Sequence, residues 1–176
     1  MHTGYSGDGQ FTDNGFMAYS RRYVIDLGPV DLSKPGAYKY KLAGMPRAEF
    51  NVSIRVFEGK RNQWDVQPEY PVSVRVQMQT VNGESVIFEE GSLNSWVRSF
   101  GVLDDVSDLY RRGESREIPL ARGGSTYEPL GVKASGGWGT YFKSETNRTY
   151  ILQLEVLSSE NWDRPARVLV EGWDRA

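Results

Sequence analysis

Apolar and polar residues alternate with a period of two along much of this chain. The pattern is clearest in five segments, at residues 38–42, 50–56, 72–78, 150–156 and 167–171. Successive side chains of a β-strand point to opposite faces, so each segment predicts a strand with one buried face and one face in water. Weaker strand patterns bring the expected total to about nine; they lie at residues 23–27, 85–89, 96–102, 127–133 and 138–143.

Turn signals separate these segments. Asn82 and Gly83 directly follow one strong strand pattern, and both residue types tolerate positive φ. They therefore predict a type I′ turn and a tight hairpin into residues 85–89. Residues 104–112 alone resemble a helical turn, with two aspartates near its start. Residues 111–125 are rich in glycine, serine and charged side chains, which indicates a long loop.

Together these signals favour an all-β fold. Alternating segments, antiparallel turns and the lack of a strand–helix–strand rhythm predict an antiparallel two-sheet β-sandwich, jelly-roll or immunoglobulin-like, with at most one short helix. A closed barrel is the alternative. The chain has 176 residues, which is the usual size of one domain. We expect a single β-sandwich domain over residues 1–176, with residues 1–15 as a loose N-terminal segment.

Composition argues against several kinds of chemistry. The chain has no cysteine and one histidine, His2, so thiolate nucleophiles, cysteine-bound zinc and Ser–His dyads are not expected. We expect no cofactor and no metal, and a protein that is not an enzyme. The net charge is −2 with acids and bases interspersed, which argues against a nucleic-acid partner. No apolar run is long enough for a membrane span.

Aromatic residues supply the first candidates for binding. Trp64 and Trp162 lie in polar, loop-like surroundings. An exposed tryptophan there would form a recognition surface, and one that folds back would close the end of the sandwich. Trp138 and Tyr141 lie in a glycine-rich segment, residues 136–142. Such aromatic faces stack on sugar rings, although the same residues suit a turn that leads into a core strand.

Charged residues supply the second set of candidates. Arg111 and Arg112 open the expected loop at residues 111–125. Arginine is enriched at protein interfaces, so this loop is a candidate for contact with an acidic protein partner, the alternative being a solvated loop. Three aspartates between residues 104 and 108 could offer oxygens to calcium, but their spacing lacks the glycine and bidentate acid of a dedicated loop. We interpret them as a helix cap with a solvated acidic face.

Two parts of the chain carry a resemblance to known proteins. The first is the opening strand Tyr23-Val24-Ile25-Asp26-Leu27-Gly28 with its continuation to Tyr38, and the second runs from Trp138 through Asn147-Arg148-Thr149-Tyr150 to Gly172. These patterns of strands and turns resemble small bacterial periplasmic or lipoprotein β-sandwich domains of uncharacterised function. The resemblance implies an extracytoplasmic location and a lipid anchor on a cysteine upstream of Met1. Some such proteins are thought of as envelope accessory or immunity proteins, and the resemblance carries over no catalytic residues.

The expected function is therefore binding. We predict a non-enzymatic extracytoplasmic domain that recognises a protein partner in the cell envelope. The alternative is a carbohydrate-binding module that uses its exposed aromatics. An acid/base enzyme such as a glycosidase would need two carboxylates set across a cleft, which sequence spacing does not reveal. A structural subunit that assembles by strand addition would use the open edges of the sandwich.

Overall fold

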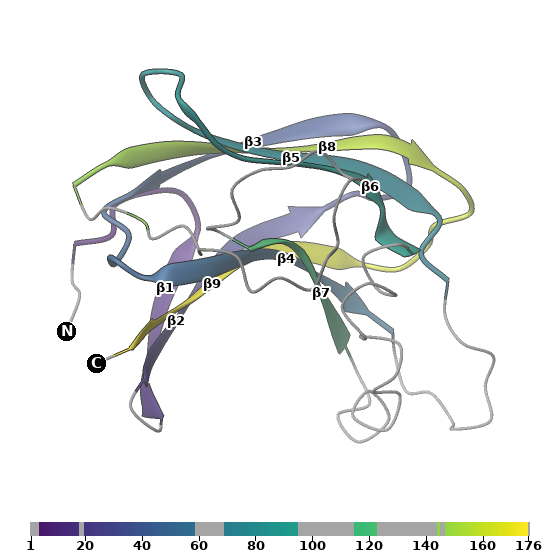
Figure 1. Ribbon diagram of the computed structural model, residues 1–176. Coiled ribbons are helices and arrows are strands. Elements are labelled where there is room, and N and C mark those ends of the chain that lie inside the picture. Colours follow the sequence, from purple (N-terminus) through teal and green to yellow (C-terminus); the bar gives the residue numbers. More distant parts are fainter. Residues whose placement is uncertain are drawn as a thin grey trace, which may run out of the picture.

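Two β-sheets packed face to face form the protein (Figure 1). The computed structural model describes residues 4–17, 20–58, 69–94, 115–122, 144 and 147–175. The strands of this described part are β1 (Gln10–Met17), β2 (Ser20–Val30), β3 (Gly36–Ala43), β4 (Glu49–Phe57), β5 (Val72–Thr80), β6 (Ser85–Ser92), β7 (Ser115–Arg122), β8 (Thr149–Ser159) and β9 (Ala166–Arg175). One sheet has the order β1-β2-β9-β4-β7 and the other β3-β8-β5-β6. The predicted all-β sandwich is confirmed.

The strand pairing is that of a jelly roll. The hairpin β5–β6 is enclosed by the antiparallel pair β4–β7, and the pairs β3–β8 and β2–β9 enclose it in turn. The chain therefore folds as one long antiparallel hairpin that is rolled into two layers, with β1 added at one edge. This nesting distinguishes the jelly roll from the immunoglobulin-like alternative, and the two separate sheets replace the closed barrel.

The core lies between the two sheets and is built by the alternating residues. Along β4, Phe50, Val52, Ile54 and Val56 are buried, and Val72, Val74, Val76 and Met78 of β5 are buried opposite them. Each fully buried side chain of this size contributes about 1.5–3 kcal/mol relative to an exposed one. The period-two pattern therefore both forms the strands and holds the two layers together.

A bulge lengthens the predicted strand at residues 23–27. The register between β2 and β9 shifts between Asp26 and Gly28, and the Gly28 amide donates to Asp26 Oδ1 at 2.9 Å. Before the bulge every second residue up to Leu27 faces inward, and after it the next inward residue is Val30. Leu27 and Val30 are both buried. The strand consequently continues to Val30, three residues beyond the end that simple alternation gives.

Residues 4–15 are held against the two sheets, which corrects the prediction of a loose segment at residues 1–15 for this described part. Residues 10–17 form β1 on the edge of one sheet, and residues 4–9, here called the N-terminal strap, lie along β3 of the other sheet. The Ser6 amide donates to the Ala43 carbonyl at 3.0 Å, and the Asp8 amide donates to the Lys41 carbonyl at 2.7 Å. Backbone hydrogen bonds therefore order a segment whose composition resembles that of a loop.

The predicted loop at residues 111–125 contains a strand, β7, which is a second correction. Arg116, Ile118 and Leu120 alternate inward and are buried. The sequence did not predict this strand, because the charged Arg116 occupies an inward position and Pro119 lies within the strand. Proline is tolerated because β7 is an edge strand, at a register shift opposite β4.

The β5–β6 hairpin is confirmed, but its turn is not type I′. The Gly83 amide donates to the Thr80 carbonyl and the Thr80 amide to the Glu84 carbonyl, both at 2.9 Å. Gly83 alone in this turn has positive φ, 89°. The Glu84 amide also donates to Thr80 Oγ1 at 3.2 Å, which sets Thr80 and Glu84 as the closing pair. The loop therefore has three residues and ends on a left-handed glycine.

Several predictions lie outside the described residues. These are the strand candidates at residues 96–102, 127–133 and 138–143 and the helical turn at residues 104–112. Within the described part of the chain, no helix is both long and apolar enough to cross a membrane.

Candidate functional site

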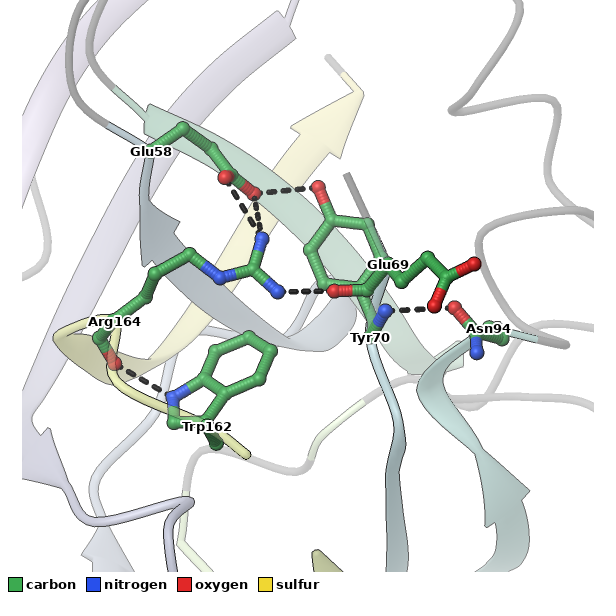
Figure 2. A network of polar contacts seen from close by, with 6 residues as sticks. All are labelled: Glu58, Glu69, Tyr70, Asn94, Trp162 and Arg164. Carbon is green, nitrogen blue, oxygen red and sulfur yellow. Dashed lines mark hydrogen bonds and ion pairs between the residues drawn. The ribbon is translucent and has the colours of Figure 1, made fainter. Parts of the chain in front are cut away.

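A cluster of polar and aromatic side chains closes one end of the sandwich. It consists of Glu58, Glu69, Tyr70, Asn94, Trp162 and Arg164, here called the Glu58 cluster (Figure 2). Its members come from the end of β4, the start of β5, the end of β6 and the connection from β8 to β9. Four places that are distant in the sequence therefore meet at this end.

The same alternation that builds the core directs Glu58 and Tyr70 inward. Glu58 continues the inward series of β4, two residues after Val56, and Tyr70 precedes Val72 in the inward series of β5. Both residues are buried. A carboxylate in that position must have a partner, because burying an isolated charge costs several kcal/mol.

Arg164 is a partner of the Glu58 carboxylate. Its Nη1 lies 2.9 Å from Oε1 and 2.8 Å from Oε2 of Glu58, and the Tyr70 hydroxyl donates to Oε1 at 2.6 Å. The Glu58 side chain is 0% exposed and that of Arg164 is 17% exposed. Arg164 Nη2 also donates to the Glu69 carbonyl. These charge-assisted hydrogen bonds join the β8–β9 connection to β4 and to the residues that precede β5.

Two aromatic rings cover the guanidinium. The centre of the Arg164 guanidinium lies 4.1 Å from the ring centre of Trp162 and 4.8 Å from that of Tyr70. Trp162 Nε1 donates to the Arg164 carbonyl at 2.6 Å. Asn161, with φ of 49°, reverses the chain just before the tryptophan, and asparagine tolerates this left-handed conformation better than most residues. Cation–π contact and a satisfied indole N–H thus fix Trp162 against the cluster.

Tyr70 is held on both its backbone and its hydroxyl. Its amide donates to Asn94 Oδ1 at 2.7 Å. Burial, the hydrogen bond to Glu58 and the negative charge of Glu58 raise the pKa of the Tyr70 hydroxyl, while Arg116 and Arg164 oppose this rise. The hydroxyl therefore stays protonated and acts as a hydrogen-bond donor, which ties β5 to β4.

The Glu58 cluster fixes the position of one carboxylate, that of Glu58, through its ion pair with Arg164. Glu58 is shielded from solvent and paired with a cation, whereas a glycosidase requires two carboxylates across a cleft. No group of three His, Cys, Asp or Glu side chains within the described ranges could hold a metal ion. The hydrogen bonds and the ion pair of the cluster join β4, the residues before β5, the end of β6 and the β8–β9 connection, so the cluster is a structural tie between them.

An exposed aromatic lies beside this support. Phe57, the last residue of β4, immediately precedes Glu58, and this residue is 50% exposed. Its amide donates to the Pro165 carbonyl at 2.9 Å, and Pro165 directly follows Arg164. The backbone of Phe57 is therefore bonded to the β8–β9 connection and adjoins the Glu58 cluster, while the residue is half-exposed.

Of the residues predicted to bind, the structure describes Trp162. It is 7% exposed and belongs to the hydrophobic core, so its place fits the interpretation in which it closes the end of the sandwich. The other candidates lie outside the described residues; they are Trp64, Trp138, Tyr141, Arg111 and Arg112. The glycan interpretation, which uses Trp138 and Tyr141, stays a prediction.

Sequence reasoning missed Glu58, Tyr70 and Arg164. A signal existed for the first two, because counting in twos from Val56 and Val72 reaches them. No comparable signal marks Arg164, which lies in an irregular connection. Comparison with known proteins adds no functional residue: no protein-family model matches this chain, and no curated protein matches it.

Proposed function

We infer that this chain is a non-enzymatic binding domain of the cell envelope that recognises a protein partner through the end of the sandwich at Phe57. The observation that carries this proposal is the half-exposed Phe57 at a strand end that is bonded to the β8–β9 connection and adjoins the Glu58 cluster. Aromatic side chains dominate the binding energy of many protein interfaces. A rigid backbone beneath such a side chain lowers the entropy cost of binding.

The charged cluster supports the same interpretation. Arg164 and Glu58 join the β8–β9 connection to β4, and Asn94 joins the end of β6 to Tyr70. Residues 59–68 and 95–114 are attached to the chain at Glu58, Glu69 and Asn94. Trp64, Arg111 and Arg112 belong to these two segments, which lie outside the described residues, so their part in recognition stays a prediction. The envelope location rests on the family resemblance of the sequence.

Photo-crosslinking from two exposed apolar positions tests the proposal. Benzoylphenylalanine is placed at Phe57 in one variant and at Val81 in a control variant. Val81 is 63% exposed and lies in the β5–β6 turn, at the opposite end of β5 from Tyr70. Both proteins are produced in the source cells and irradiated. We expect a discrete crosslinked protein from position 57 and none from position 81. The same product from both positions, or no product from position 57, would contradict the proposal.

A further inference from the structure

The outer edge of β3 is only partly covered. The N-terminal strap pairs with its C-terminal half, where Ser6 and Asp8 donate to the carbonyls of Ala43 and Lys41. Asp8 Oδ2 also accepts the Lys41 amide at 2.7 Å. After Asp8 the strap leaves this edge, because Gly9, with φ of 76°, turns the chain toward β1 on the other sheet.

No backbone hydrogen bond from the described residues reaches the outer side of the other half of this edge. In an antiparallel strand the residues that bond to one side alternate with those that bond to the other. Lys41 and Ala43 bond to the strap, so Ala37 and Lys39 direct their N–H and C=O groups to the same side, away from β8. Both residues are exposed. Within the described part of the chain, the first half of β3 therefore has no partner strand on this side and can accept one.

The side chains on this edge are basic and without ion pairs. In the described part of the chain, Arg55, Arg75 and Arg167 each form an ion pair on a sheet surface. No described acid lies within ion-pair distance of the Lys39 or Lys41 ammonium groups, whose neighbours across the ladder on β8 are Gln153 and Ile151. The edge therefore offers two positive charges in line with its open hydrogen-bonding groups.

We propose that the open half of the β3 edge binds an extended acidic segment of a partner protein as an added strand. Backbone groups of Ala37 and Lys39 would pair with the segment, and alternate carboxylates would meet Lys39 and Lys41. The strap gives an internal example of a carboxylate at this edge, since Asp8 Oδ2 accepts the backbone amide of Lys41. This surface is separate from Phe57, so the inference goes beyond the function proposed above.

Lys39 and Lys41 also determine which kinds of strand should not bind to the β3 edge. Lysine on an edge strand discourages pairing with apolar or basic strands, because the ammonium would be desolvated or repelled. An acidic strand removes that penalty. The same two side chains thus exclude most extended segments and admit acidic ones, which is how discrimination between partners is commonly achieved.

Binding of short synthetic peptides to the full chain tests this inference by fluorescence anisotropy. The probe is a labelled peptide of alternating Glu and Val. One comparison peptide has Lys in place of Glu, and another keeps Glu but has alternate backbone nitrogens methylated. We expect saturable binding of the first peptide and at least about tenfold weaker binding of the other two. Equal binding of the methylated peptide would overturn strand addition, and equal binding of the Lys peptide would overturn the acidic preference.

Variants of the protein complete the test. Lys39→Glu combined with Lys41→Glu should weaken binding of the Glu–Val peptide about tenfold or more. Ala37→Pro removes one outward N–H group and should therefore also weaken binding of the Glu–Val peptide. The variant should still fold, because proline is accepted on an edge strand. Arg47→Glu, an exposed change beyond the end of β3, is the control and should alter binding less than about twofold. Circular dichroism confirms that each variant is folded. No binding by the wild-type chain, or equal losses in Arg47→Glu and the lysine variant, would refute the inference.

Discussion

At the scale of single residues, the ion pair between Glu58 and Arg164 is the most sensitive feature of the molecule. The Glu58 carboxylate is buried at the end of the sandwich and the Arg164 side chain is mostly buried, with Tyr70 and Trp162 arranged around them. Losing one member of a buried pair costs more than the pair contributes, since the remaining charge keeps its desolvation penalty. The energetic role of this pair can be separated from that of surface pairs in the same chain.

Arg164→Met should lower the free energy of unfolding by about 3 kcal/mol, because it removes a cation that is bonded to both oxygens of the buried Glu58 carboxylate. Arg167→Met is the matched control. Arg167 pairs with Asp26 at 3.1 Å, but its side chain is 47% exposed, so the expected loss is below about 1 kcal/mol. Urea denaturation of both variants measures the difference. Equal losses would show that the Glu58 cluster is no stronger than a surface pair.

Glu89 gives the protein a pH-dependent stability. It lies on the same face of β6 as the buried Ile87, and burial raises its pKa from 4.5 to about 7. The folded state therefore favours the protonated acid. Below about pH 4.5 Glu89 is protonated in both the folded and the unfolded state and does not destabilise the protein. As the pH rises from there to about 7, the free energy of unfolding decreases.

Glu89→Gln should remove that loss of stability. The variant should match the wild type near pH 4.5 and be more stable by about 1 kcal/mol at pH 8, a figure reduced for solvent screening of a half-buried group. Glu90→Gln is the control, because Glu90 points to the opposite face and pairs with Arg75 at 3.1 Å; it should give no gain at pH 8. Thermal unfolding at the two pH values measures the stability of both variants. An equal gain from Glu89→Gln and Glu90→Gln at pH 8 would contradict the raised pKa of Glu89.

At the scale of elements, the β5–β6 hairpin depends on one glycine. Gly83 has φ of 89° while Asn82 does not have positive φ, so the two turn positions should respond differently. Gly83→Val should destabilise the protein by about 1–3 kcal/mol, because a β-branched residue resists this conformation. Asn82→Val should cost much less. Chemical denaturation measures the loss of stability in each variant. Equal losses would favour a type I′ turn, in which both residues have positive φ.

The elements also show where sequence patterns succeed and fail. Strands β3, β4, β5 and β8 alternate without interruption, so counting in twos found them. The pattern fails at β1, where a register shift between Asp13 and Gly15 breaks the alternation, and at β7, where an inward arginine and a proline disguise it. In both strands the pairing with a neighbour decides the structure, and that pairing is not written in the local sequence.

At the scale of the whole molecule, the nested strand pairs bring together residues that the sequence separates widely. Glu58 and Arg164 lie 106 positions apart, and they meet because β4 and β9 are neighbours in one sheet. Local patterns therefore predicted the two-sheet fold. Counting in twos from Val56 could also have found the inward position of Glu58, but no local pattern indicates its partner. The N-terminal strap depends on the same topology, since it binds β3 on one sheet and continues into β1 on the other.

The central claim, a protein-binding surface at Phe57, is tested most directly by measuring affinity for the crosslinked partner once it has been purified. Isothermal titration calorimetry compares the wild type with Phe57→Ala and with Val81→Ala as the control. We predict that Phe57→Ala weakens binding about thirtyfold, which corresponds to about 2 kcal/mol for an aromatic at the centre of an interface, and that Val81→Ala changes it less than about twofold. Unchanged affinity in Phe57→Ala, or equal losses in both variants, would contradict the account.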